Sequence, residues 1–397
     1  ALWTGERIGP ADGPAVTIAD AGAVRRLARR PSVDTAVELW SQKRIDIEGG
    51  TIFDIAEMRP EGGLKSRLRA MPRLKLLRDL PSLLIGSGEP PSGLAGSNPF
   101  ESGSGRDAIR HHYDVSNRFY ELFLDRRMVY SCGYFREWHD DIDRAQLDKL
   151  EHICRKLRLK PGERFLDIGC GWGALLIHAV KHHGVVAHGV SLSEAQTALA
   201  RERIRAEGLE DRITIEIRPY GELTGQFDKI ASIGMFEHVG LRHHDAYFGK
   251  IRELLVPGGL YLHHTIARRA KKNARAFART GPESRAIVKY IFPGGELDHV
   301  GMSVQNLEAH GFEVHDVENL REHYGRTCRL WAERLAARQT EAIAEVGEAK
   351  TRLWILYLAG CSIAFSRGTL HINQTLARRR TRGASGLPPT RADLYRD

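Results

Sequence analysis

The sequence predicts an α/β fold in which helices cover an open, mostly parallel sheet, preceded by a small α+β unit. Within residues 164–264, apolar runs of strand length alternate with stretches of helical periodicity. Such alternation is typical of a parallel sheet covered by helices. Residues 86–106 are rich in Gly, Ser and Pro and separate this region from residues 1–85. That composition indicates a flexible linker between two folded units.

The first unit, residues 1–85, contains a helical pattern over 34–40. Two apolar runs follow, at 45–47 and 52–55, and they flank the pair Gly49-Gly50. Short apolar runs around a Gly-Gly turn predict a small β-hairpin.

The large unit, residues 107–380, is followed by a polar tail, 381–397, that we expect to be frayed. Its longest apolar run, Leu353–Phe365, is shorter than the ~20 residues that span a bilayer and predicts a buried helix. The pattern also predicts strands at 164–168, 185–190, 213–217, 229–233 and 260–264, helices at 174–182 and 193–207, and a turn at 254–259. Ligands of such sheets bind beyond the carboxyl ends of the strands, so chemistry is expected directly after them.

The segment Phe165–Gly173 is the strongest functional signal. It reads Phe-Leu-Asp-Ile-Gly-Cys-Gly-Trp-Gly and places Asp167, Gly169, Gly171 and Gly173 between a strand and a helix. Glycines allow a sharp turn and let a ligand lie against bare backbone. The helix start adds free N–H donors, so a nucleotide-like cofactor is expected here.

Two cofactors compete for this loop. Gly169, Gly171 and Ala174 satisfy the dinucleotide pattern G-x-G-x-x-A, which also requires an acidic residue about 20 positions on. The second apolar run ends instead at Ser191-Leu192-Ser193. Asp167 and Gly173 complete the D-x-G-x-G-x-G loop of S-adenosylmethionine (SAM) enzymes. The sequence therefore favours SAM over NAD.

Basic residues give the chain a net charge of +9 and gather in three clusters, at 65–78, 268–279 and 378–382. Such clusters suit an anionic polymer or an anionic membrane face. Solvated helix faces would explain them equally well.

The cysteines and the N-terminus bear on the cellular compartment. The five cysteines show neither C-x-x-C metal spacing nor an even number for pairing. The first residues, 1–7, have no signal-peptide apolar region. We therefore expect a cytoplasmic protein with no metal site and no structural disulfide.

Further motifs follow the predicted strands or could cover their ends. They are Y-S-C-G-Y at 130–134, S-x-x-x-x-Q at 191–196, M-F-E-H-V-G at 235–240, H-T-I at 264–266 and H-Y-x-x-T at 323–327. With the glycine loop, this ordered set closely resembles cyclopropane-fatty-acid synthases and mycolic-acid cyclopropane synthases, over about residues 107–380. The resemblance implies a Rossmann-like class I SAM-dependent methyltransferase sheet with a helical cap.

The resemblance also implies the activity and the partners. The enzyme would add a methylene group to the cis double bond of unsaturated acyl chains in membrane phospholipids. The protein would then lie peripherally on the anionic inner face of the cell membrane, as a homodimer formed through residues 1–85, and would not bind nucleic acid. In this family the acyl-chain carbocation is deprotonated by a bound bicarbonate.

Site residues carry over from the family motif by motif. The resemblance implies catalytic or bicarbonate-binding roles for Cys132, Glu237, His264, Ile266 and Tyr324, and places Cys361 near them. The expected donors are the His264 and Tyr324 side chains and the backbone N–H groups of Cys132 and Ile266, with Glu237 orienting the ion. SAM contacts are implied for Tyr130, Ser131, Asp167, Gly169, Gly171, Gly173, Ser191, Gln196 and Tyr220.

Three alternatives stay open. An enzyme of the same fold could add a methyl or methylene branch to an acyl chain, which needs the same deprotonation. A nucleic-acid methyltransferase would carry a D/N-P-P-Y-type loop where Glu237-His238 stands. A non-catalytic lipid-binding protein would be expected to have lost residues that are all present here.

Overall fold

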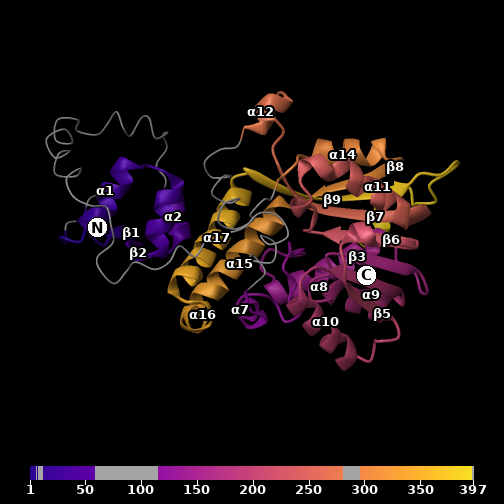
Figure 1. The fold of residues 1–397 in the computed structure, drawn as a ribbon, viewed down its shortest axis with the longest axis horizontal. Helices are drawn as coiled ribbons and strands as arrows, with labels where there is room; N and C mark the ends of the chain where they lie inside the picture. The colour runs from indigo at the N-terminus through magenta and orange to yellow at the C-terminus, as the bar shows by residue number, and fades with distance from the viewer. Residues whose placement is uncertain (6, 8–11, 59–114, 280–295, 396–397) are drawn as a thin grey trace.

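The computed structural model describes residues 1–5, 7, 12–58, 115–279 and 296–395 (Figure 1). A seven-stranded sheet in the order β5-β4-β3-β6-β7-β9-β8 forms its centre. The strands are β3 Arg164–Ile168, β4 Val186–Ser191, β5 Ile213–Ile217, β6 Phe227–Ile233, β7 Leu255–Arg268, β8 Phe312–Asn319 and β9 Leu370–Arg379. The predicted linker, 86–106, and the basic cluster 65–78 lie outside the described residues.

The first five strands of the sheet are parallel, and β9 runs antiparallel between β7 and β8. The α/β prediction is confirmed. The turn expected at 254–259 is instead the last residue of α11 and the start of β7, where the pairing with β6 shifts register between Phe227 and Lys229. A Cβ on Gly259 would lie 2.8 Å from the Asp228 carbonyl oxygen, so this irregular stretch requires glycine.

Helices cover both faces of the sheet. One face carries α8 Ile142–Leu157, α9 Ala174–His183 and α10 Glu194–Ala206; the other carries α11 His244–Leu254 and α14 Val300–Ala309. Alternate side chains of each strand enter the two cores, as the two-residue period of a strand requires. Phe165 packs in the first core and Leu166 in the second.

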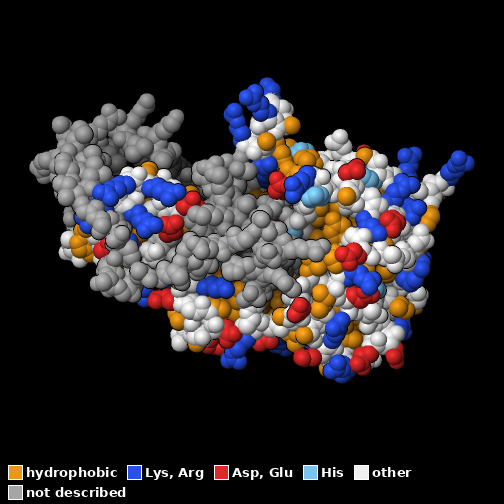
Figure 2. Space-filling model, in the orientation of Figure 1, with side chains coloured by type: hydrophobic (Ala, Val, Ile, Leu, Met, Phe, Trp, Pro, Cys, Tyr) orange, Lys and Arg blue, Asp and Glu red, His pale blue; other side chains and the backbone are white. Residues whose placement is uncertain are grey.

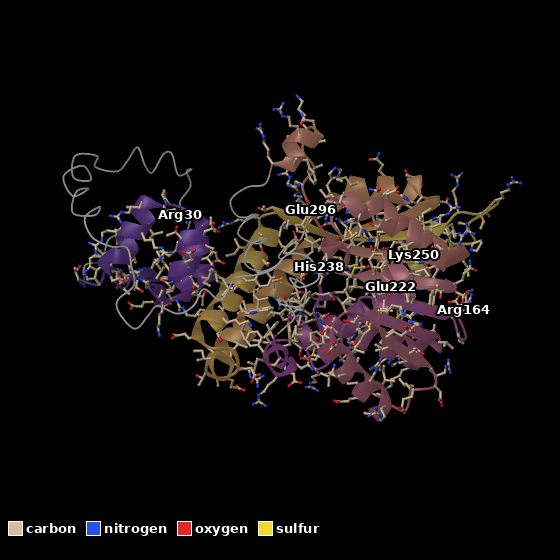
Figure 3. All side chains as sticks on the ribbon, in the orientation of Figure 1. Arg30, Arg164, Glu222, His238, Lys250 and Glu296 are labelled. Atoms are coloured by element: carbon tan, nitrogen blue, oxygen red, sulfur yellow. The ribbon has the colours of Figure 1, made fainter. Side chains whose placement is uncertain are left out.

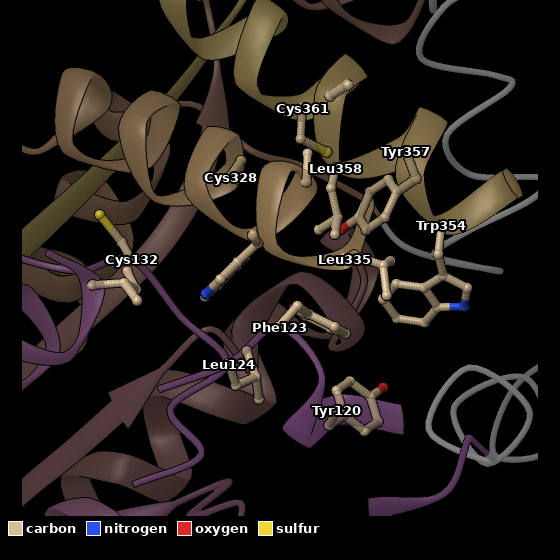
Figure 4. Packing of buried hydrophobic residues seen from close by; sticks show 14 of the residues in the cluster. Tyr120, Phe123, Leu124, Cys132, Cys328, Leu335, Trp354, Tyr357, Leu358 and Cys361 are labelled. Carbon is tan, nitrogen blue, oxygen red and sulfur yellow. The ribbon is translucent and has the colours of Figure 1, made fainter. Parts of the chain in front are cut away.

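A helical cap packs beside the sheet and matches the prediction. It consists of α7 Asn117–Glu121, α15 Arg321–Ala337, α16 Gln339–Val346 and α17 Glu348–Ser366. The helix expected at Leu353–Phe365 is therefore confirmed within α17. Its buried side chains, among them Trp354, Tyr357 and Leu358, meet Tyr120 and Phe123 in one apolar cluster (Figure 4). Among the described helices, none combines the length and apolarity needed to cross a bilayer.

The N-terminal residues fold as β1 Ala15–Ile18, α1 Ala21–Arg29, α2 Val33–Ser41, β2 Ile45–Glu48 and α3 Ile52–Glu57. The helix predicted at 34–40 is confirmed. The predicted hairpin is wrong, because β2 pairs with β1 and residues 52–57 form a helix. Thr51 and Asp54 make a reciprocal capping box at its start, which favours a helix over a second strand.

Arg352 of α17 anchors this N-terminal unit to the cap. Its guanidinium donates to the Trp40 carbonyl at 2.8 Å and the Ile45 carbonyl at 3.0 Å, and lies 4.3 Å from the Trp40 ring centroid. The Trp40 indole N–H donates back to the Arg352 carbonyl at 2.9 Å. A buried cation therefore joins α17 to α2 and β2, and α3 also packs against α17.

The described part of the C-terminal tail, residues 381–395, is held in place rather than frayed. The short 3-10 helix η4, Ala392–Leu394, packs against α8, and the Leu394 side chain is buried. Arg158 and Asp393 approach to 2.9 Å, and Arg391 and Asp316 to 2.6 Å. Short polar segments can be fixed by a few such contacts, which composition alone does not show.

The remaining described elements are the 3-10 helices η1 Tyr220–Glu222, η2 Phe236–His238 and η3 Leu241–His243, and the short helix α12 Ala274–Ala278. The first three follow strands β5 and β6 at the carboxyl edge of the sheet. Helix α12 projects from the body of the molecule (Figure 1).

Candidate functional site

The glycine loop joins β3 to α9. Gly169, Gly171 and Gly173 have φ values of 83°, 53° and 79°, a region that L side chains rarely adopt. A Cβ on Gly169 would lie 3.0 Å from the Met235 Cβ, so the loop runs close to the turn after β6. A Cβ on Gly171 would meet no atom of the described residues within 4 Å. The backbone at Gly171 is thus open to a ligand.

Asp167 lies at the end of β3, directly before the loop. Its carboxyl is buried, and Oδ1 has no hydrogen-bond partner among the described residues. Burial raises the pKa of Asp167 to about 7, although the positive charge of Lys149 opposes the shift. A buried carboxyl oxygen without a donor is costly, so this atom is suited to accept a hydrogen bond from a bound ligand.

Ser191 and Gln196 meet at the end of β4. The Ser191 hydroxyl donates to Gln196 Oε1 at 3.3 Å and accepts the Ser193 N–H at 3.2 Å. Tyr220 follows β5, and its ring packs 5.1 Å from that of Tyr247. All three predicted SAM contacts therefore lie at the expected edge of the sheet.

Lys149 was not predicted from the sequence. Its ammonium is buried and donates to the Ser131 hydroxyl at 2.8 Å, and Gln146 holds the Ser131 carbonyl at 2.8 Å. Burial lowers the pKa of Lys149 to about 8, and Asp125, Cys132 and Asp167 oppose the shift. Polar residues at buried positions of an otherwise apolar helix face were the sequence signal that could have identified it.

The neighbouring Tyr130 ring packs against aromatic side chains near the cap: its centroid lies 5.3 Å from that of Tyr120 and 5.3 Å from that of Trp331.

Glu237 stands in η2, just after β6. Its Oε1 accepts the backbone N–H of Ile266 at 2.6 Å, and its buried Oε2 has no partner among the described residues. Burial raises the pKa of Glu237 to about 7, although hydrogen bonds from the Ile266 N–H and the Thr265 side chain oppose the shift. One expectation is corrected: the Ile266 N–H is held by Glu237 and is not a free donor for an anion.

His264 lies on β7, opposite Ile233 of β6. Its Nδ1 lies 3.1 Å from the Gln374 Nε2, and its Nε2 is buried without a partner among the described residues. With the Gln374 amide nitrogen as donor, Nδ1 accepts and the proton resides on Nε2. Burial holds the pKa of His264 well below its usual range, so the ring is neutral and Nε2–H is a donor.

Cys132, Tyr324 and Cys361 contribute weakly acidic groups near the cap. Burial raises the pKa of Cys361 to about 12 and that of Cys132 further, so neither is a thiolate nucleophile at neutral pH. Desolvation also raises the pKa of Tyr324, and the thiols of Cys132 and Cys361 add to it. These three predicted residues therefore share one region of the cap.

Behind Glu237 runs a buried hydrogen-bonded chain. The Tyr247 and Tyr261 hydroxyls lie 2.9 Å apart, and Tyr261 lies 2.9 Å from His263 Nδ1. His263 Nε2 lies 3.3 Å from the Ser303 hydroxyl, which donates to Asp298 at 2.6 Å. His263 thus belongs to a structural network. The adjacent His238 lies near the middle of the molecule (Figure 3), where burial lowers its pKa to about 4.

Comparison with known proteins matches this geometry to one family. Residues 101–375 match the model of the family described as mycolic acid cyclopropane synthetase. A probable fatty acid methyltransferase from Pseudomonas putida is 38% identical over 402 residues, covering 100% of this chain and 95% of the relative. The cyclopropane-fatty-acyl-phospholipid synthase of Escherichia coli K12 is 38% identical over 268 residues, covering 67% of this chain and 66% of the relative.

Solved structures agree. The cyclopropane synthase MmaA2 from Mycobacterium tuberculosis superposes with a TM-score of 0.65 at 32% identity, over 68% of this chain and 97% of its own. The mycolic acid cyclopropane synthase CmaA1, complexed with SAH and CTAB, gives 0.64 at 34% identity, over 68% and 97%. The family match covers the glycine loop, the cap and the sheet except for the last residues of β9. The chain therefore belongs to the cyclopropane synthase family of SAM-dependent methyltransferases.

Proposed function

We propose that this chain transfers a methylene group from SAM to the cis double bond of an unsaturated phospholipid acyl chain and so forms a cyclopropane ring. The observation that carries the proposal is the arrangement at the carboxyl edge of the sheet. An open glycine loop runs beside the turn that bears Glu237, and the buried Glu237 and His264 atoms there have no partner among the described residues.

SAM would bind along the glycine loop and supply an electrophilic methyl group on its sulfonium. Gly171 offers open backbone, and the free oxygen of Asp167 accepts a hydrogen bond. Ser191 and Gln196 provide nearly buried polar groups at the next strand end. Lys149 fixes Ser131 and balances the buried charge of Asp167.

Bicarbonate would accept the proton that ring closure releases. We assign its donors to the His264 Nε2–H, the Tyr324 hydroxyl and the Cys132 backbone N–H. Glu237, with a pKa of about 7, would face the ion through Oε2. The Ile266 N–H orients this carboxyl instead of binding the ion. The thiol of Cys361 stays protonated and packs in the cap.

The cap suits a reaction that develops positive charge on an acyl chain. Its aromatic rings exclude water, and a cation over such faces is stabilised by up to ~2 kcal/mol when desolvated. Tyr130 and Tyr324 both pack on Trp331, with centroids 5.3 Å and 6.1 Å away. Phe119, Tyr120 and Phe123 pack in the same apolar cluster as Trp331.

An anionic membrane surface is the proposed partner. Lys and Arg side chains gather on the projection that carries α12 (Figure 2), including the exposed Arg269, Lys271, Lys272 and Arg275. In the cluster at 378–382, by contrast, Arg378 is buried and Arg379 donates to the Arg252 carbonyl at 3.0 Å. We propose a peripheral, cytoplasmic enzyme that dimerises through its N-terminal unit.

A second candidate is a fatty-acyl methyltransferase that leaves a methyl or methylene branch. It is favoured by the Pseudomonas putida relative, whose name is probable fatty acid methyltransferase and which covers the whole of this chain. Both reactions use the same cofactor loop and require the same deprotonation, so the site accommodates either outcome.

The test is expression in a bacterium that lacks cyclopropane lipids, followed by analysis of its phospholipid acyl chains. The proposal expects a product heavier by one CH2 in which the olefinic proton resonances are replaced by upfield ring resonances. Retained olefinic resonances with the same mass gain would identify the branching reaction. No modified chain, with Glu237→Gln as the inactive control, would reject both.

A further inference from the structure

A cluster of metal-binding side chains lies outside the site described above. Cys154, His178 and His183 each place one ligand atom, a sulfur or a ring nitrogen, within 4.8 Å of the others. Cys154 is on α8, whereas His178 and His183 are on α9. Cys154 lies far from the two histidines in the sequence, so the three residues do not form a short metal-binding motif.

A carboxylate lies beside the group. Glu151, one turn before Cys154 on α8, lies with its Oε2 3.0 Å from Nε2 of both His178 and His183. Its Oε1 accepts from Arg155 at 2.7 Å. The three residues thus offer one sulfur and two imidazole nitrogens, and the Glu151 carboxylate is within hydrogen-bond distance of both rings.

We propose that Cys154, His178 and His183 form a structural zinc-binding site that joins α8 to α9, with the neighbouring Glu151 carboxylate as the fourth ligand. A tetrahedral set of sulfur, nitrogen and oxygen ligands is typical of Zn²⁺ among the divalent cations. The Cys154 thiol releases its proton to solvent as the metal–sulfur bond forms. An imidazole that binds through Nε2 carries its proton on Nδ1, and no redox change is involved.

The position of the cluster gives the metal a consequence for the cofactor site. Helix α8 also carries Lys149 and Gln146, which hold Ser131, and α9 begins at Gly173 of the glycine loop. A bond across the two helices restricts the same elements that shape the SAM site. We therefore expect metal to increase the affinity for SAM, and SAM must then increase the affinity for metal by the same factor.

Solvent can reach the cluster from one side. The Cys154 and His178 side chains are buried, whereas His183 and Glu151 keep 17% and 28% of their side-chain surface exposed. Metal can therefore enter past His183 in the folded protein. The test does not need refolding.

The experiment is a Co²⁺ titration of the full chain after treatment with a chelator. We expect one Co²⁺ per chain, with the near-ultraviolet band of a cobalt–thiolate bond and the visible bands of tetrahedral coordination. Zn²⁺ should displace both. Cys154→Ser should abolish the thiolate band, and His183→Gln should weaken binding at least tenfold.

Matched controls separate ligation from general damage. His182→Gln changes a histidine whose ring lies 4.5 Å from His178 but which is not in the cluster, and Cys328→Ser changes a buried cysteine in the cap. Both should bind Co²⁺ as the unmodified chain does. Circular dichroism of each metal-free variant checks that it is folded. A missing thiolate band, or equal Co²⁺ binding by the folded Cys154→Ser or His183→Gln variants, would overturn the proposal.

Discussion

The Glu237 carboxyl accepts the backbone N–H of Ile266 at 2.6 Å and so joins the turn after β6 to strand β7. The bond leaves Oε2 as the free end of a buried acid whose pKa is about 7. The backbone of β7 thereby fixes the orientation of the Glu237 side chain, and its second oxygen remains available to a ligand or a proton.

Glu237→Gln should keep this geometry and lose the acid. We expect activity to fall on the order of 10²–10³-fold, the usual effect of removing one positioned group from a water-excluded site. The affinity for SAM, measured by calorimetry, should change little. If bicarbonate takes the proton, bicarbonate-free buffer will slow the unmodified enzyme and added bicarbonate will restore it. Indifference to bicarbonate would make Glu237 itself the base.

Gly171→Val should abolish SAM binding without unfolding the protein. The φ of 53° disfavours a branched side chain, and the side chain would enter the space where the ligand approaches. Gly162→Val is the matched control, because Gly162 has a φ of 80°, equally open surroundings and a place in the turn before β3. Calorimetry and thermal melts of both variants separate the effects; equal loss of SAM binding in the two would argue against the assignment.

The sequence predicted the parallel core because its strands are apolar and separated by helices. It did not reveal β9, whose residues include Asn373, Gln374 and Thr375, all buried. Polar residues at buried positions of a strand remove its hydrophobic pattern, and their hydrogen-bond partners come from distant parts of the chain. Gln374, for example, orients His264 across a sequence separation of 110 residues.

The site residues also divide into those that the sequence revealed and those that it did not. Motifs adjacent in sequence, such as the glycine loop, were found directly. Lys149 was not, because its function depends on Ser131 and on charges from Asp125 and Asp167 that only folding brings near. The Cys154 cluster was missed for the same reason, since metal spacing was sought along the chain and the ligands come from two helices.

Lys149→Met should weaken SAM binding at least tenfold. The change keeps the apolar stem but removes the hydrogen bond to Ser131 and the cation near Asp167. A lost hydrogen bond to a charged group costs about 1.5–3 kcal/mol. Lys160→Met, at an exposed position after α8, is the control. Calorimetry measures the affinity of both variants for SAM. An unchanged affinity in Lys149→Met would show that this residue contributes only to packing.

Asp298 gives a test of pH dependence. Burial raises its folded-state pKa from 3.8 to about 7, so the folded protein binds this proton more tightly than the unfolded chain. Its contribution to stability is full below pH 3.8 and is lost as pH rises to about 7. Buried histidines such as His263, with a pKa of about 3, act in the opposite direction.

The difference between the unmodified chain and Asp298→Asn therefore isolates this acid. The free energy of unfolding of the unmodified chain, minus that of the variant, should fall between about pH 4 and about pH 7. Urea denaturation at several pH values measures it. A difference that stays constant with pH would show that Asp298 does not titrate in this range.

The basic projection around α12 should provide the first contact with an anionic bilayer. Arg268 stacks on Phe277, 3.7 Å from the ring centroid, which fixes the base of the projection and leaves the neighbouring Lys and Arg side chains exposed. Each such cation near an anionic surface contributes about 1 kcal/mol, screened over ~8 Å at physiological salt. The triple variant Lys271→Gln, Lys272→Gln, Arg275→Gln should therefore bind anionic vesicles at least tenfold more weakly, with a shallower salt dependence.

The control for this variant removes the same charge elsewhere. Arg30, Lys160 and Arg382 are exposed at positions outside α12, and their change to Gln should cost less affinity. Vesicle sedimentation with anionic and neutral lipids, at low and at physiological salt, measures both triple variants. Equal losses in the two would indicate that net charge alone attracts the protein. A loss of vesicle affinity in the α12 variant alone would identify the α12 projection as the membrane-facing side. The two variants have the same net charge, so a difference between them must come from where the charges lie.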